Sequence, residues 1–131
     1  MISSFRFFIA FSLLMLLGKY ALAHHAYSTD FDPDKYGTVS GEVVEVFYAN
    51  PHAQYIMRVT AEDGTTINWA IVTMNLGAVS RIGWTKDTLR IGEKLTVYGR
   101  LGRDARPLIW PQTVTREDGT VLDLESAGPL K

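Results

Sequence analysis

The sequence predicts a small all-β domain with one short helix, and three features of the residue pattern support this. Apolar and polar side chains alternate over three short segments, which is the period of a half-buried strand. These segments are residues 54–60, 66–71 and 95–100. Turn-forming residues such as Asn50-Pro51 and Asp63-Gly64 separate the segments. Apolar residues at helical spacing occur in one stretch, 74–82.

Residues 1–23 have the three parts of a signal peptide in order. A segment with Arg6 comes first, an apolar run from Phe7 to Leu17 follows, and Ala21-Leu22-Ala23 provides the small residues that a signal peptidase recognises. This apolar run is shorter than the roughly 20 residues that a membrane-spanning helix needs. We therefore expect cleavage after Ala23, no stable membrane anchor in the mature chain, and a periplasmic or secreted location.

Composition narrows the classes of function. The sequence has no cysteine, which excludes lipoprotein attachment, disulfide bonds and thiolate metal sites. Cleavage would remove Arg6 and Lys19, so that 13 basic residues become 11 against 14 acidic ones, a net charge of −3. Nucleic acid is therefore not an expected partner, because phosphate backbones attract basic proteins. The mature length suits one domain with a single core.

The mature chain begins with a segment that has no β pattern. Residues 24–37 are polar and include Pro33, which predicts an extended N-terminal arm. From Thr38 the composition changes to β-branched and aromatic residues, so the β domain, residues 38–123, is expected to start there with a long first strand. Gly41 allows a coil or bulge in that strand, and Asn50-Pro51 ends it.

The second and third strands, at 54–60 and 66–71, form a predicted hairpin. Glu62-Asp63-Gly64-Thr65 joins them, and its Asp-Gly pair is typical of a tight turn. The same four residue types recur at Glu117-Asp118-Gly119-Thr120. We interpret the recurrence as one turn used twice, and not as a domain duplication.

A short helix is predicted within residues 74–82, because Gly83 follows the helical spacing. A fourth strand at 95–100 and a fifth at 108–115 complete the domain. Pro111 requires an edge or a bulge in the fifth strand. Residues 124–131 are expected to form a flexible tail.

Three strands, a short helix and two further strands is the element order of the OB-fold. The expected architecture is therefore a small five-stranded, OB-like, partly open barrel. An up-and-down barrel or an open sandwich would show similar periodicities.

The three histidines of the chain lie at two places. His24 and His25 adjoin at the expected mature N-terminus, and His52 follows the turn that ends the first strand. After cleavage His24 would offer its ring and a free α-amine, whose ordinary pKa of about 7.7–8.0 lets a metal ion displace the proton at neutral pH. Together with the ring of His52 this makes three nitrogen ligands, a set that suits Cu(II).

The copper hypothesis favours one histidine of the pair. Successive side chains of an extended arm point to opposite sides, so His24 is the expected partner of His52, and His25 is the weaker candidate. The alternative is a solvated His24-His25 pair at a frayed terminus, with a His52 that has no role beyond its turn.

A second class of function rests on the loop between the last two strands. Arg100, Arg103 and Arg106 lie there, and in an OB-like barrel this loop approaches Asn50 in the loop after the first strand. These residues predict a module for an anionic or sugar ligand, and a protein-interaction subunit is a third hypothesis. The sequence lacks a nucleophile elbow, a phosphate loop and an HExxH zinc signature, so we expect no catalytic residue.

Several short motifs resemble one known family. They are His24-His25-Ala26, Phe31-Asp32, Asn50-Pro51-His52, Trp69, Arg81-Ile82-Gly83-Trp84-Thr85, Gly92-Glu93 and Asp118-Gly119. Together they resemble small periplasmic proteins classed as a domain of unknown function, whose mature chains start His-His-Ser and contain an Asn-Pro-His turn. The resemblance covers nearly all of the mature chain and implies export and a single domain. It implies no reaction, because that family has no assigned activity.

Two positions depart from the pattern of this family. Ala26 replaces the usual serine, and Val72 stands where an acidic residue follows Trp69 by three. If members of the family bind metal, the second departure removes a carboxylate ligand or a partner of a ligand.

Overall fold

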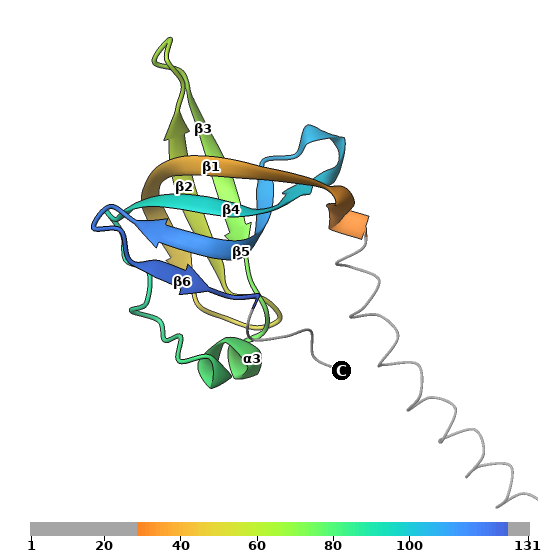
Figure 1. Cartoon of the computed structure of the whole chain (residues 1–131), viewed down its shortest axis with the longest axis vertical. Coiled ribbons are helices and arrows are strands. Elements are labelled where there is room, and N and C mark those ends of the chain that lie inside the picture. The colour runs from red at the N-terminus through yellow and green to blue at the C-terminus, as the bar shows by residue number, and fades with distance from the viewer. Residues whose placement is uncertain (1–28, 126–131) are drawn as a thin grey trace, which may run out of the picture. The chain divides into compact units, whose positions relative to one another are not determined.

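The computed structural model describes residues 29–125, which form a mostly β fold with one short α-helix and one 3-10 turn (Figure 1). The elements are β1 (Phe31–Phe47), β2 (Gln54–Thr60), β3 (Thr66–Val72), α3 (Leu76–Arg81), β4 (Lys94–Gly102), η1 (Arg103–Ala105), β5 (Leu108–Arg116) and β6 (Val121–Asp123). The predicted fold class is confirmed. The chain divides into two compact units, residues 1–30 and 31–131, and the fold described here is that of the second.

The strands form one sheet in the order β3-β2-β1-β4-β5-β6, with antiparallel neighbours. A short parallel pairing of β3 with β5, Ala70 with Leu108 and Ile71 with Ile109, curls this sheet partly into a ring. The amide of Ala70 also donates to the carbonyl of Pro107 (2.9 Å). In Figure 1, β2 and β3 run across β4 and β5 on the opposite side of the ring. The sheet is thus partly ring-like and not a closed barrel. Its element order is the predicted OB-like one, except that the sheet has six strands and not five.

The first strand starts earlier than the sequence predicted. We expected an arm as far as Gly37 and a strand from Thr38, but β1 begins at Phe31, and its residues from Tyr36 to Glu42 pair continuously with β4. The register shifts between Phe31 and Tyr36, where Asp-Pro-Asp-Lys interrupts the pattern. Pairing with β4 imposes the extended conformation here although the composition is polar. Residues 24–28 of the predicted arm lie outside the described residues, as does the predicted signal peptide.

Side chains from all the long strands fill the interior of the ring. The fully buried residues with the largest side chains include Tyr55, Met57, Ile71, Leu89 and Ile109. Trp84 is also buried, and Trp69 packs against this core from its rim. The predicted tail is packed at its first residue, because Leu124 is buried and its amide donates to the carbonyl of Gln112 (2.8 Å). Residues 126–131 of that tail lie outside the described residues.

The pairing has irregularities at Pro111, as the sequence predicted, and in β1 a few residues after the predicted position, Gly41. The β1–β2 register shifts between Val43 and Glu45, close to Gly41. The β4–β5 register shifts beside Pro111, which pairs with Gly99 while Thr113 pairs with Tyr98. Pro111 therefore adjoins a bulge, where a missing N–H breaks no regular ladder.

The two turns with the same residue types adopt the same structure. Gly64 and Gly119 have positive φ angles of 83° and 87°. Asp63 accepts a hydrogen bond from the amide of Thr65 (2.9 Å), and Asp118 accepts one from the amide of Thr120 (2.8 Å). The interpretation of one turn used twice is confirmed. The second copy also explains the sixth strand, because it returns the chain along β5 as β6, which is three residues long.

Candidate functional site

The ring of His52 is held in one orientation by a backbone carbonyl. His52 is half-buried in the turn between β1 and β2, and its Nδ1 lies 2.8 Å from the carbonyl oxygen of Thr73. A carbonyl oxygen accepts and never donates, so Nδ1 carries the proton and donates. In the neutral ring Nε2 then keeps its lone pair. This is the arrangement usual for metal-binding histidines, which donate their other ring N–H to a carbonyl or carboxylate.

The carbonyl that accepts from His52 belongs to Thr73, a buried residue whose hydrogen bonds join two loops. Thr73 is 1% exposed, and both its amide and its hydroxyl donate to the carbonyl of Ala53 (2.9 Å each). The amide of Ala53 donates in return to the carbonyl of Met74 (3.3 Å). These contacts join the turn after β1 to the junction between β3 and α3, so the position of His52 is fixed by the fold.

Asn50 strengthens the same junction. Its side-chain oxygen accepts a hydrogen bond from the amide of Leu76 (3.1 Å), the first residue of α3, while Asn75 caps the helix by accepting from the amide of Ala78 (3.0 Å). Helix starts have amides without intrahelical partners. The side-chain oxygen of Asn50, the predicted residue of the alternative ligand site, is thus engaged in a structural contact.

The ring of Trp110 lies between His52 and Phe31, the first residue of β1, and contacts both. The rings of Trp110 and His52 meet edge to face, with centres 5.9 Å apart and planes at 76°. Trp110 also meets Phe31, with ring centres 5.8 Å apart and planes at 70°. Edge-to-face contacts of this kind are favourable for aromatic rings. The beginning of β1 therefore lies two ring contacts from His52, although 21 residues separate them in the sequence.

The other predicted metal ligands are not described. His24 and His25 lie outside residues 29–125, so their pairing with His52 stays a prediction. Within 29–125, no group of three or more His, Asp or Glu side chains gathers in a way that would hold a metal ion. Val72, where the resemblance expects an acidic residue, immediately precedes Thr73 and pairs with Gln54. An acidic residue at position 72 would therefore be the sequence neighbour of Thr73, whose carbonyl accepts the hydrogen bond from His52.

Only two of the three predicted arginines lie in the loop between β4 and β5. The prediction was wrong for Arg100, because β4 continues to Gly102 and includes it. Arg100 is on the outer face of β4, where its Nη2 donates to the Tyr36 hydroxyl (2.6 Å) and its guanidinium lies 5.3 Å from the centre of that ring. Arg103 and Arg106 are together at η1, and Nε of Arg106 donates to the carbonyl of Arg103 (3.3 Å). Arg100 and Arg106 thus each donate a hydrogen bond to another residue of this domain.

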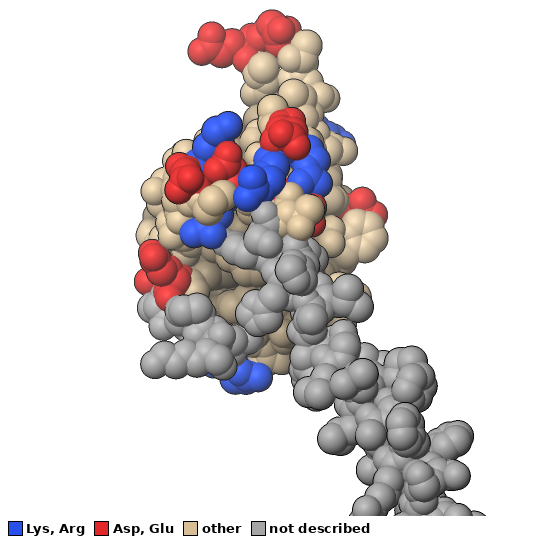
Figure 2. All heavy atoms as spheres, turned by 90° about the vertical axis from the view of Figure 1, so that its right-hand side faces the viewer, with Lys and Arg blue, Asp and Glu red and all other residues tan. Residues whose placement is uncertain are grey.

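Positive and negative side chains are mixed around the β4–β5 loop, which holds Arg103 and Arg106 (Figure 2). Figure 2 shows Lys and Arg side chains next to Asp and Glu side chains on the side of the molecule where the β4–β5 loop lies. Asp32 is one such neighbour: the amide of Asp34, and then the charges of Lys35 and Arg103, hold the pKa of this carboxyl below its usual value. A mixed surface attracts an anion less than a basic one does.

Sequence reasoning found the turn with His52 but missed what positions it. The partner of His52 is a backbone carbonyl, which cannot be recognised from residue type. Apolar Phe31 within a polar stretch was the one visible signal that the start of β1 is anchored.

Residues 29–125 include no helix long and apolar enough to span a bilayer. The fold and the site thus define a small, mostly β domain with a partly ring-like sheet and a conformationally fixed histidine whose ring contacts Trp110. The chain belongs to the family described as "Family of unknown function (DUF6152)", which matches residues 13–108. The expected membership of an uncharacterised family is confirmed to that extent.

Curated proteins also show similarity to part of the chain. It is 35% identical over 80 aligned residues to the protein RnfH of Salmonella newport and to that of Salmonella enteritidis. The same identity is found with the UPF0125 protein YfjF of Salmonella typhimurium. Each alignment covers 50% of this chain and 83% of the other protein.

Proposed function

We propose that this protein is exported and that its mature chain binds a copper ion through His24 and His52. The observation that supports this most is the 2.8 Å hydrogen bond from Nδ1 of His52 to the carbonyl of Thr73. It leaves Nε2 as the metal-binding nitrogen and fixes the ring before any ion arrives. A ligand that is already ordered loses little conformational entropy on binding.

The length of chain between the two proposed ligands is sufficient. Seven residue steps lead from His24 to Phe31, and an extended chain covers about 3.3–3.6 Å per residue. Phe31 is linked to His52 through the Trp110 ring by two contacts of 5.8 and 5.9 Å. A tether of this length is compatible with the proposed pairing of His24 with His52.

The proposal requires export and cleavage, because an internal His24 has no free amine. Signal-peptide features at 1–23 support this step, and a periplasmic or secreted location is part of the proposal. Mass spectrometry of the protein recovered from the culture medium or the periplasm tests it. The expected mass is that of a chain beginning at His24, and a chain that begins elsewhere would remove the amine ligand.

A Cu(II) titration of matched chains tests the ligands. The reference chain begins at His24, and a second retains Ala21-Leu22-Ala23 ahead of it, which moves the free amine away from the histidine. We expect the second chain and a His52→Ala variant each to bind Cu(II) at least about ten-fold more weakly, since each loses a nitrogen ligand. His25→Ala is the matched control and should keep the affinity of the reference.

Two readouts, tryptophan fluorescence and electron paramagnetic resonance, distinguish a loss of Cu(II) binding from a loss of the fluorescence signal. Cu(II) at Nε2 of His52 should quench the fluorescence of Trp110, whose ring centre is 5.9 Å from that of His52. Trp110→Phe should reduce the quenching while electron paramagnetic resonance still shows nitrogen ligands. Equal affinity of the His52→Ala variant and the reference would refute the two-ended site, and so would equal affinity with the amine displaced.

A further inference from the structure

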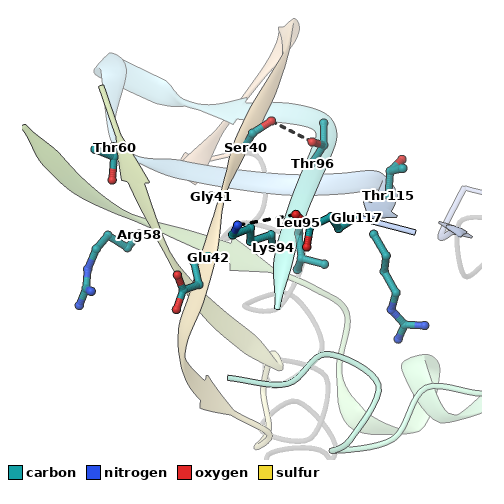
Figure 3. A pocket seen from close by; sticks show the side chains of 11 residues that line it. Ser40, Gly41, Glu42, Arg58, Thr60, Lys94, Leu95, Thr96, Thr115 and Glu117 are labelled. Carbon is teal, nitrogen blue, oxygen red and sulfur yellow. Dashed lines mark hydrogen bonds and ion pairs between the residues drawn. The ribbon is translucent and has the colours of Figure 1, made fainter. Parts of the chain in front are cut away.

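An open groove of about 410 Å³ lies on the outer surface of the barrel, where β1, β4 and β5 lie beside the end of β2 (Figure 3). Its volume lies within the range of small-molecule sites. The residues that line it are polar and exposed for the most part. The groove does not include His52 or any other proposed copper ligand.

Charged side chains of alternating sign form one row across the strands. Arg58 of β2 pairs in register with Glu42 of β1, and Glu42 pairs on its other side with Lys94 of β4. Nζ of Lys94 lies 3.6 Å from the carboxylate of Glu117, an ion pair that Figure 3 marks. The row contains two positive and two negative charges. Arg116 also lines the groove and is paired with Glu93 (3.3 Å), so the groove favours neither a polyanion nor a polycation.

Hydroxyl groups form the next row, one step along the strands. Ser40 of β1 pairs in register with Thr96 of β4, which pairs with Thr115 of β5. The hydroxyls of Ser40 and Thr96 lie 2.9 Å apart, and Thr60 at the end of β2 also lines the groove (Figure 3). A hydroxyl both donates and accepts. The row therefore offers donors and acceptors on three neighbouring strands, β1, β4 and β5.

Two exposed tyrosines continue this face beyond the groove. Tyr98 follows Thr96 by two residues on the same side of β4, and it is 42% exposed. Its ring stacks on that of Tyr36, which is 39% exposed, with centres 6.2 Å apart and planes at 27°. The Arg100 guanidinium donates to the Tyr36 hydroxyl. The pair thus presents an ordered aromatic surface next to the hydroxyl row.

We propose that this face binds a neutral oligosaccharide, with one sugar ring on Tyr98 and its neighbours along the hydroxyl row. Sugar hydroxyls need partners that both donate and accept, which Ser40 and Thr96 supply. The electron-rich face of a tyrosine ring attracts the positively polarised C–H groups of a sugar ring. The balanced charge row adds hydrogen-bonding groups without selecting for ligand charge. This site is independent of the proposed copper site.

Titration of the ¹⁵N-labelled protein with neutral hexasaccharides tests the proposal by NMR. The probes are the hexamers of glucose in α and β linkage and the hexamer of N-acetylglucosamine. We expect at least one of them to shift the amide signals of Thr96 and Tyr98. Tyr98→Ala and, separately, Thr96→Val should weaken this binding by about ten-fold, the effect of removing one central contact.

Matched variants elsewhere on the sheets keep the test specific. Phe47 is 50% exposed on β1 and Ile67 is 57% exposed on β3, and neither lines the groove. Phe47→Ala and Ile67→Ala should bind as the wild type does. Thr96→Val removes only one exposed hydroxyl. Its effect on binding therefore tests the proposal even if Tyr98→Ala fails to fold. Three results would overturn the proposal: no shift with any of the three probes, shifts confined to other elements, or tighter binding of a heparin hexasaccharide.

Discussion

At the scale of single residues, Tyr55 carries a buried hydroxyl group whose burial is energetically unfavourable. Its side chain is fully buried, and its hydroxyl has no hydrogen-bond partner among the described residues. Trp84 packs edge-on against its ring, with centres 6.2 Å apart. Burial, and then the nearby Tyr48, raises the pKa of Tyr55 to about 12. Nearby Tyr48 is different, because its hydroxyl donates to the carbonyl of Trp84 (3.1 Å).

Tyr55→Phe should therefore stabilise the protein. An unpaired buried hydroxyl costs roughly 1–3 kcal/mol, so we expect the free energy of unfolding at neutral pH to rise by about 1 kcal/mol. Urea denaturation measures this. Tyr48→Phe removes a satisfied hydroxyl and should lower stability. A loss of stability in Tyr55→Phe would show that a bound water molecule satisfies the hydroxyl.

The same substitution has a signature at high pH. The folded protein keeps the Tyr55 proton up to about pH 12, whereas the unfolded chain releases it at its ordinary value of 10.0. The stability from the neutral phenol is present below pH 10.0 and is lost as the pH rises through about 12, because the unfolded state then binds fewer protons. Tyr55→Phe should lack this loss, which amounts to about 1.4 kcal/mol per pH unit.

At the scale of elements, β1 depends on Gly41 to pass β2 closely. A Cβ at position 41 would lie 2.3 Å from the carbonyl oxygen of Arg58, which belongs to the backbone and cannot move without disturbing β2. Gly37 lies on the same strand, but a Cβ there would meet the end of the Leu101 side chain at 2.9 Å. That side chain can rotate away.

We expect Gly41→Ala to destabilise the protein by at least about 3 kcal/mol and Gly37→Ala by less than about 1 kcal/mol. Thermal unfolding of the two variants measures the difference. Similar melting temperatures would show that β1 and β2 can separate at this point without cost.

The elements that the sequence predicted best are those whose signal is local. The Asp-Gly turns, the bulge at Pro111 and the strands with alternating residues depend on neighbours in the chain. The start of β1 was missed because the pairing of Tyr36 with Arg100 holds together residues 64 positions apart. The orientation of His52 was missed for the same reason, since a distant carbonyl determines it. The Asn-Pro-His turn itself was visible, whereas the stacking of Tyr36 on Tyr98 requires the register of two strands.

At the scale of the whole molecule, the ring is joined by a short seam. Two parallel residue pairs and the bond from Ala70 to Pro107 connect β3 with β5, while β1, β4 and β5 pair over most of their lengths. We expect the seam to open before the rest of the fold unfolds.

Hydrogen exchange tests this order of opening. The amide of Ala70 should exchange at least about ten-fold faster than that of Val97, which lies between two partner strands, after correction for intrinsic rates. Uniform protection across both sites would indicate that the ring opens and closes as a single unit.

The double pairing of β1 also limits where the chain can change in length. One half of this strand pairs with β4 and the other with β2, so a residue inserted between Tyr36 and Phe47 would turn inward-facing side chains outward along one partner. The tip at 62–65 has no such restriction, because both flanking strands would keep their alignment. Peptide tags or natural insertions should therefore be tolerated at that tip and rejected within the first strand.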